Sequence, residues 1–376
     1  MTLIDQARAL LKQEFGVSAH HAVFAPGRVN LIGEHTDYNE GLALPCALGL
    51  GTAVAVSPRT DDQIVAVSVN GEELHRDQFS AREPTPGPRG WWGNYLRGMV
   101  AEMKAFGIQT SGAHLAIVGN VPPGAGLSSS ASLSIAIGKA LVAGHSDAAK
   151  VDATTLARWG QSTEHHYAGC FCGIMDQMTI AHASSGEVIF LDCRSLAVRR
   201  RPIPPAWSIL IAHSGVPREL VAGEYNLRRQ QCNDAARFYD VPSLRDLDPN
   251  MIATLPRPTN DTLFRRAKHV VLENVRVERA AEAMHDGDLN TFGRLLRESH
   301  VSLRDDFEVT VPEVDELVDL ANAVIDQYAN GVGGARMTGG GFGGCIVAAV
   351  PTETAERLKQ ALIGESRRAV WEQTGS

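Results

Sequence analysis

Long apolar segments are absent from this chain of 376 residues. No stretch approaches the roughly 20 uninterrupted apolar residues that a membrane-spanning helix needs. The first residues, MTLIDQARALLKQEF, are interrupted by Asp5, Gln6, Arg8 and Lys12. That spacing predicts an amphipathic helix rather than a secretory signal. We therefore expect neither a membrane span nor a membrane partner.

Cysteine pairs at metal-binding spacing are also absent. The six cysteines are scattered along the chain, and none forms a C-x-x-C pair. Cys170 and Cys172 are separated by one residue, but no His/Cys cluster at zinc spacing follows them. We interpret the cysteines as reduced thiols, which predicts a reducing compartment and hence a cytoplasmic location.

Positive charge is scarce. The chain carries 35 Lys and Arg against 43 Asp and Glu, so its formal net charge is −8, and its longest basic run is the triplet Arg199–Arg201. An acidic protein repels phosphate backbones, which argues against nucleic-acid binding. We interpret the triplet as a solvated edge. The 44% of apolar and 21% of charged residues are ordinary for a soluble globular protein long enough for two domains.

Strict alternation of strands and helices is absent, which favours an α+β fold over a doubly wound sheet. Short Val/Ile-rich runs predict strands at Gly51–Ser57, Gln63–Val69, Ala113–Val118, Glu187–Leu191, Ser208–His213 and Cys345–Val350. Apolar periodicity predicts helices over Ser130–Val142, Asp152–Tyr167 and Glu313–Tyr328. The polar, Pro-rich segment Arg199–Ala206 is typical of a domain junction. We therefore expect domains over residues 1–200 and 201–376.

What the chain does contain is a glycine- and serine-rich segment, PPGAGLSSSAS (Pro122–Ser132), directly before a buried helix. Gly124 and Gly126 allow the backbone to approach a phosphate closely, and serines at a helix start offer hydroxyl and N–H groups where the helix dipole favours an anion. The segment is neither a Walker A loop nor G-x-G-x-x-G. The alternative is a glycine loop before a serine-capped helix.

Two further segments are rich in polar residues. The first, Ala25–Pro45, crowds hydrogen-bonding side chains into twelve positions, as recognition of a polyol requires, although a polar turn would look the same. These side chains are Arg28, Glu34, His35, Asp37, Tyr38 and Asn39. The second, Glu164–Gln177, contains Asp176 among apolar neighbours, where a carboxylate needs a partner; we nominate Arg28. A kinase needs such carboxylates for Mg²⁺ and near the attacking hydroxyl.

These segments, in this order, resemble galactokinases, within the wider family of homoserine, mevalonate and phosphomevalonate kinases. The resemblance is carried by GRVNLIGEHTDYNEG (Gly27–Gly41), PPGAGLSSSAS, CGIMDQ (Cys172–Gln177) and GGARMTGGGFGGC (Gly333–Cys345). It implies an N-terminal domain like domain 2 of ribosomal protein S5, a ferredoxin-like C-terminal domain and an active site between them. The implied reaction transfers the γ-phosphoryl group of ATP to the C1 hydroxyl of D-galactose, giving α-D-galactose 1-phosphate and ADP.

The resemblance also implies residue roles. Asp176 matches the base that takes the proton of the C1 hydroxyl, and Arg28 matches its partner, which is expected to stabilise charge on the moving phosphoryl group. Ser130 and Glu164 match the Mg²⁺ ligands. The ATP phosphates are assigned to Gly124, Ala125, Gly126, Leu127, Ser128, Ser129 and Ser130. The sugar is assigned to Arg28, Glu34, His35, Asp37, Gly173, Asp176 and Tyr225.

The sequence departs from the galactokinase pattern at Cys170-Phe171 and at Ser214–Leu220, both on the substrate side. A kinase for N-acetylgalactosamine, arabinose or galacturonate is therefore one alternative, although Glu34 would repel a substrate carboxylate. A sensor that binds sugar and ATP without turnover is another. The uninterrupted run Ser128–Leu133 and the presence of Asp176 favour an enzyme. The oligomeric state is left open by the sequence, with a monomer among the possibilities.

Overall fold

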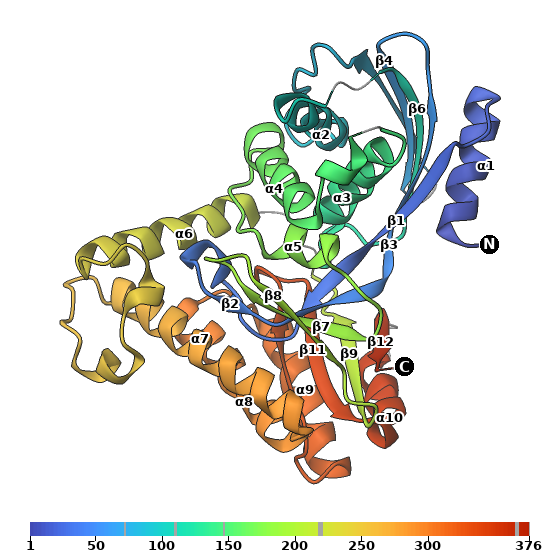
Figure 1. Ribbon diagram of the computed structural model, residues 1–376. Coiled ribbons are helices and arrows are strands. Elements are labelled where there is room, and N and C mark those ends of the chain that lie inside the picture. Colours follow the sequence, from blue (N-terminus) through green and yellow to red (C-terminus); the bar gives the residue numbers. More distant parts are fainter. Residues whose placement is uncertain (71–72, 109–110, 146, 217–220, 365–367, 376) are drawn as a thin grey trace. The chain divides into compact units, whose positions relative to one another are not determined.

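The computed structural model describes residues 1–70, 73–108, 111–145, 147–216, 221–364 and 368–375 (Figure 1). Its contacts divide the chain into two compact units. Unit 1 comprises Met1–Arg28, Leu48–Pro122 and Ser128–Ala183, and unit 2 comprises Val29–Ala47, Pro123–Leu127 and Ser184–Ser376. Both units combine helices with mostly antiparallel strands, so the predicted α+β class is confirmed. The domain boundary at residue 200 stays a prediction.

Unit 1 is built on strands in the order β3-β6-β4-β5. Their bounds are β3 Pro45–Pro58, β6 Ala113–Gly119, β4 Gln63–Asn70 and β5 Glu73–Ser80. β4 runs parallel to β6, and the other two pairings are antiparallel. The strand β1 (His21–Asn30) leads from unit 1 into unit 2 along the chain and carries Arg28.

Helices lie on both faces of this sheet (Figure 1). α1 (Leu3–Phe15) packs Ala7 and Leu11 against one face, on Ala53, Ala55 and other small residues. The opposite face is covered by α2 Gly93–Ala105, α3 Ser129–Val142, α4 Ala153–Thr163 and α5 Met175–Ala181. α3 is apolar on most sides because it lies inside this helical layer, as its sequence predicts.

The described helices follow the predicted ones with one instructive difference. Asp152, the first residue of the predicted helix, caps α4 by accepting a hydrogen bond from the backbone of Thr155 at 2.7 Å. The helix ends earlier than predicted, at Thr163, and continues as one π-helical turn over Glu164–Ala168 that Gly169 terminates at φ +73°. Such π turns are frequent at functional sites, and this one begins at a predicted magnesium ligand.

Unit 2 contains the antiparallel sheet β10-β11-β9-β12. The strands are β10 Gly334–Thr338, β11 Cys345–Pro351, β9 Trp207–His213 and β12 Val370–Thr374. The helices are α6 Val221–Phe238, α7 Asp261–Asp286, α8 Leu289–Ser302, α9 Pro312–Tyr328 and α10 Thr352–Ile363. Alternate residues of β9 and β11, such as Leu210 and Ile346, join the apolar core of these helices.

A smaller group of strands in unit 2 consists of β2 (Leu42–Ala43), β7 (Glu187–Asp192) and β8 (Val198–Pro202). The triplet Arg199–Arg201 lies in β8 and is exposed, which confirms the solvated edge. The first residues of the segment Arg199–Ala206 pair with β7, and its role as a domain junction stays a prediction. The proline that ends β8 cannot donate to a further strand, which limits pairing at this end of the edge.

All six predicted strands are present. Their bounds differ from the predicted ones by no more than one residue, except that β3 starts at Pro45 rather than at Gly51. Glycine at position 51 weakens a strand signal, but the structure needs it there. A Cβ atom on Gly51 would lie 2.3 Å from the carbonyl oxygen of Ala25. Close backbone packing against β1 therefore explains the glycine inside the strand.

Candidate active site

Arg28 and Asp176 form an ion pair in unit 1. The guanidinium donates from Nε and Nη2 to Oδ1 of Asp176 at 2.8 and 2.5 Å. The Arg28 side chain is 6% exposed and that of Asp176 is 28% exposed. Asp176 lies in the first turn of α5, where the helix dipole favours a negative charge. The partner nominated from sequence is thus confirmed, and part of the carboxylate remains accessible to solvent.

Ser128 holds the other oxygen of this carboxylate. Its hydroxyl donates to Oδ2 of Asp176 at 2.5 Å. Ser128 stands at the N-cap position of α3 with φ +60°, a left-handed conformation that is uncommon for serine. Within the described part of unit 1, the Ser128 side chain forms no capping bond to the helix. The backbone therefore aims this hydroxyl at Asp176 instead of at the amides of α3.

Two glycines of the phosphate segment adopt left-handed backbone conformations. Gly124 and Gly126 have φ +71° and +76°, shortly before the left-handed Ser128. Ala125 and Leu127 are buried. α3 then begins at Ser129, so its first turn presents the amides of Ser129 and Ser130 at a helix N-terminus, the usual place for an anion.

Glu164 and Ser130 meet in unit 1. Glu164 is buried, and the Ser130 side chain is close enough to its carboxylate to lower its pKa. Burial, with smaller contributions from Cys170 and Asp176, outweighs this and raises the pKa of Glu164 to about 8. Burial raises the pKa of Tyr95, whose side chain also lies near Ser130. A carboxylate and a hydroxyl are hard oxygen donors, and this neighbouring pair fits Mg²⁺.

In unit 2, His35 and Tyr225 come together in an aromatic cluster. The ring of His35, at φ +59°, lies 5.4 Å from that of Tyr225 and 4.7 Å from that of Phe307. Nδ1 of His35 is 2.8 Å from the hydroxyl of Tyr38. Tyr225 stands on α6, far along the chain from His35, so the structure assembles two predicted sugar ligands that the sequence separates.

Glu34 is held from within unit 2. Its Oε1 accepts from the backbone of Gly339 at 2.7 Å and from the Thr338 hydroxyl at 3.2 Å. The fully buried guanidinium of Arg336 lies 3.3 Å away. Arg336 also donates to the carbonyl of Leu31 at 2.8 Å. At least one oxygen of Glu34 therefore fastens the glycine tract Gly331–Gly344 to the predicted sugar segment.

Beneath the sugar segment lies a group that the sequence did not reveal. Glu273, wholly buried on α7, accepts from the backbone of Gly33 at 3.0 Å, from Ser299 at 2.6 Å and from Arg276 at 2.7 Å. Despite burial, the charges of Arg276, His269 and Arg336 lower the pKa of Glu273 to about 2. The only signal for Glu273 in the sequence is that it is a lone acidic residue at an apolar position of a long amphipathic helix.

The buried His269 extends this group. Its Nε2 is 3.1 Å from the carbonyl of Glu34, and its Nδ1 is 2.9 Å from the hydroxyl of Ser302. Desolvation lowers the pKa of His269 to about 4, so the imidazole is neutral near pH 7. We call Glu34, Glu273, Arg276, His269 and Arg336 the buried charge network. It holds the backbone on both sides of Glu34.

The remaining predicted ligands have simpler surroundings. Asp37 is half-buried and accepts from the backbone of Tyr38 at 3.0 Å. Gly173 is buried in unit 1, two residues before α5. Of the divergent stretch Ser214–Leu220, residues 217–220 lie outside the described residues. Unit 1 thus contains Arg28, Gly173, Asp176, Glu164 and the three serines, and unit 2 contains the other predicted sugar ligands.

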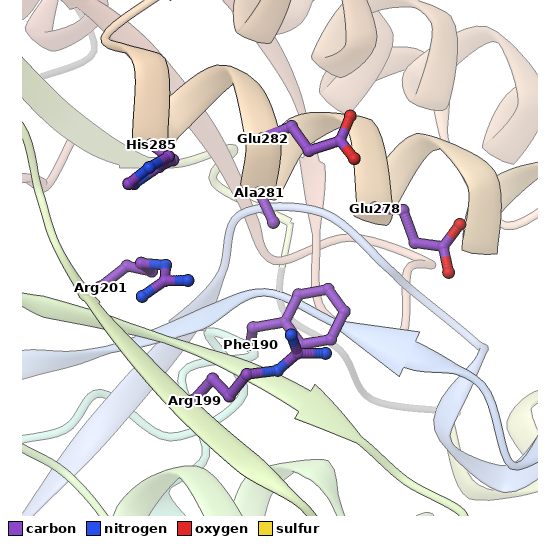
Figure 2. Close-up of a pocket in the computed structure, with 7 residues that line it drawn as sticks. All are labelled: Phe190, Arg199, Arg201, Glu278, Ala281, Glu282 and His285. Atoms are coloured by element: carbon purple, nitrogen blue, oxygen red, sulfur yellow. The ribbon is translucent and has the colours of Figure 1, made fainter.

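A surface cavity of about 430 Å³ lies elsewhere in unit 2, between β7, β8 and α7. Figure 2 shows Arg199 and Arg201 on the strands and Glu278 and Glu282 on the helix. The Arg199 guanidinium lies 4.8 Å from the ring centre of Phe190. The positive charges of the two arginines balance the negative charges of the two glutamates, and the lining includes none of the predicted site residues. We assign it no role in the reaction.

In the described parts of the chain, no helix is both long enough and apolar enough to span a bilayer.

Family models match three segments of the chain. A galactokinase galactose-binding signature matches residues 9–58, a GHMP kinase N-terminal domain matches residues 94–184, and a GHMP kinase C-terminal domain matches residues 280–366. These matches contain, in turn, the sugar segment, the segment from the phosphate serines to Asp176, and the second glycine tract.

Solved structures agree with these models. The galactokinase of Lactococcus lactis, solved in complex with galactose, is 33% identical with a TM-score of 0.89, and the match covers 100% of this chain and 99% of that one. Mevalonate kinase of Methanococcus jannaschii is 19% identical with a TM-score of 0.63, over 95% and 98% of the two chains. Phosphomevalonate kinase of Streptococcus pneumoniae is 14% identical with a TM-score of 0.65, over 94% and 99%. The last two share the fold, and the first, with the galactose-binding signature, shows that this chain belongs to the galactokinase family of GHMP kinases.

Proposed function

We propose that the chain is an ATP-dependent galactokinase that phosphorylates D-galactose at its C1 hydroxyl. A bond forms between O1 of the sugar and the γ-phosphorus, and the bond from that phosphorus to the oxygen bridging to the β-phosphate breaks. The products are α-D-galactose 1-phosphate and ADP. The galactose-binding signature and the Lactococcus relative, solved with galactose, support this substrate.

The observation that carries the proposal is the placement of Asp176. Arg28 binds one of its oxygens and Ser128 binds the other, so the carboxylate has one orientation. Its 28% exposure leaves it accessible to a substrate. In our proposal Asp176 accepts the proton of the C1 hydroxyl as the phosphoryl group transfers. Arg28 would then stabilise the negative charge that develops on that group.

Phosphate binding is proposed for Gly124–Ser130. The left-handed glycines and the start of α3 place backbone amides where an anion is favoured. Glu164 and Ser130 would hold Mg²⁺, which, when bound, neutralises charge on the phosphates. Burial of Glu164 without a cation is costly, and its raised pKa expresses that cost.

Sugar hydroxyls would bind to His35, Asp37 and Tyr225, while the buried charge network holds the backbone that carries the first two. An imidazole, a carboxylate and a phenol provide both donors and acceptors for a polyol. Glu34 would contribute mainly by fastening this segment to Gly339. A cytoplasmic location and the oligomeric state stay predictions of the sequence alone.

The test is ADP release by the purified chain with a panel of free sugars, followed by phosphorus NMR of the product. We expect turnover with galactose and a phosphate at the anomeric carbon. Turnover with arabinose or N-acetylgalactosamine in place of galactose would retain the mechanism and overturn the substrate. ATP binding without turnover of any sugar would favour a sugar-sensing protein and overturn the enzyme.

A further inference from the structure

Beside the oxygen donors proposed for Mg²⁺ lies a second type of donor. One carboxylate oxygen of Glu164 and the sulfur atoms of Cys170 and Cys172 all lie within 4.8 Å of one another. Glu164 is buried, whereas the residues Cys170 and Cys172 are each partly exposed. The three residues belong to unit 1. Glu164 is the first residue of the π turn that follows α4, and the two cysteines come just after that turn.

The loop that carries the thiols is fastened at both cysteines. The backbone of Cys170 donates to the carbonyl of Glu164 at 3.0 Å. The ring of His165 approaches the carbonyl of Cys172 at 2.8 Å, and Gln177 donates to the Cys172 sulfur at 3.5 Å. Because Cys170 and Cys172 are two residues apart in non-helical chain, their side chains can point to the same side. The donors are thus brought together by the fold itself.

Two sulfur donors and one carboxylate suit a different cation from Mg²⁺. Thiolates select soft or borderline ions such as Zn²⁺, whereas Mg²⁺ takes oxygen ligands. At Zn–S and Zn–O bond lengths of about 2.3 and 2.0 Å, tetrahedral donors lie roughly 3.4–3.8 Å apart. If the distances between the three donor atoms shortened by about 1 Å, the donors would surround Zn²⁺ and leave a fourth position for water. Sequence spacing alone gave no zinc motif because the third donor is a glutamate on the preceding π turn.

We propose that Glu164, Cys170 and Cys172 form an inhibitory binding site for a thiophilic divalent cation such as Zn²⁺. On binding, the two thiols and the Glu164 carboxyl group lose their protons to water, and the thiolates and the carboxylate become the ligands. The same carboxylate is then withdrawn from Mg²⁺. The inhibitory part of this inference rests on the proposed kinase function, whereas the binding part does not.

Binding is tested with Co²⁺, a spectroscopic substitute for Zn²⁺, added to the full, reduced chain. We expect one equivalent to produce a thiolate-to-cobalt charge-transfer band in the near ultraviolet, and Zn²⁺ to displace it. Cys170→Ser should weaken Co²⁺ binding at least about tenfold. Cys46→Ala, which removes a buried thiol of β3, is the matched control and should leave the band unchanged. No charge-transfer band, or an equal band in Cys170→Ser, overturns the site.

Inhibition is tested by ADP release with galactose at rising Zn²⁺. We expect wild type and Cys46→Ala to lose turnover, to recover it with a chelator, and to resist Zn²⁺ better at higher Mg²⁺. Cys170→Ser should keep basal turnover and need at least about tenfold more Zn²⁺ for the same loss. Cobalt binding at the thiols with undiminished turnover overturns the inhibitory role. Absence of basal turnover overturns the proposed function instead, and the spectra still decide the site.

Discussion

Two carboxylates paired with arginine, Asp176 in unit 1 and Glu273 in unit 2, differ in their exposure to solvent. In unit 1 the pair Arg28–Asp176 keeps a partly exposed carboxylate, 28% accessible, at the start of a short helix. In unit 2 the buried charge network around Glu273 is closed to solvent and directs its hydrogen bonds at the protein backbone. A carboxylate that reacts must be reachable, whereas one that positions a loop gains from being enclosed. The ion pairs are similar in chemistry, and exposure separates their roles.

The largest effect is expected at the exposed carboxylate. Asp176→Asn removes the proposed base but retains the shape of the side chain, so turnover should fall by about 10²–10⁴-fold. Unfolding by urea should change little. Steady-state ADP release with galactose measures the loss.

Asp192→Asn is the matched control for this substitution. Asp192 is also an arginine-paired aspartate, with its oxygens 2.7 and 2.8 Å from Arg245 and a side chain 23% exposed, but it lies in β7. Its turnover should stay near that of wild type. Near-wild-type turnover in Asp176→Asn would remove Asp176 from the role of base.

Substitution of the enclosed carboxylate, Glu273, should act mainly on stability. Glu273→Gln leaves Arg276 without its buried counter-charge, although Arg336 keeps Glu34. Breaking a buried pair costs about 3–5 kcal/mol of unfolding free energy. Urea unfolding followed by circular dichroism measures this change. Glu278→Gln, an exposed glutamate of the same helix, should stay within about 0.5 kcal/mol of wild type. Equal stability of both variants would contradict the network.

Acid should weaken the network in a defined window. The pKa of His269 is lowered to about 4 from its usual 6.5, so between these values the unfolded chain binds a proton that the folded chain does not. Stability should therefore fall as the pH drops from 6.5 to 4, by about 3 kcal/mol from this residue. Glu273, with its pKa near 2, adds a further loss from about pH 4.5 downwards.

Urea midpoints at several pH values measure this fall. His269→Gln, which keeps hydrogen-bonding capacity without titrating, should flatten the curve between pH 6.5 and 4. An unchanged slope in that variant would assign the acid sensitivity to other groups.

The smallest effects are expected at Ser128, where two substitutions distinguish the role of the hydroxyl from that of the left-handed backbone. Ser128→Ala and Ser128→Gly both remove the hydroxyl that binds Asp176, so each should lower turnover by about tenfold. Only glycine accepts φ +60° without cost, so Ser128→Gly should be about 1 kcal/mol more stable than Ser128→Ala. Thermal unfolding and ADP release together test both statements. If both variants turned over as fast as wild type, Arg28 alone would be sufficient to orient Asp176.

Local features of the sequence predicted most of the fold and half of the site. The helix over Ser129–Val142, the cap at Asp152 and the strand cores follow from periodicity and turn chemistry. The Arg28–Asp176 pair followed from a simple rule, because a carboxylate among apolar residues needs a cation.

What the sequence could not provide were partners that only the fold brings together. Arg336 lies in an apolar strand, and its partner Glu34 is some three hundred positions away, so no spacing links them. Ser128 resembled a helix cap, and only its left-handed backbone turns the hydroxyl to Asp176. The π turn at Glu164 brings that carboxylate to Cys170 and Cys172, which no zinc motif predicts.

The close approach of α8 to β10 has a genetic consequence. A Cβ atom on Gly293 would lie 2.1 Å from the carbonyl carbon of Gly333, and backbone on both sides leaves neither partner able to yield. α8 also carries Ser299, which binds Glu273. Every amino-acid change that one nucleotide can make in a glycine codon adds a side chain. A random screen for temperature-sensitive alleles should therefore recover codon 293 repeatedly, although its residue belongs to none of the proposed ligands.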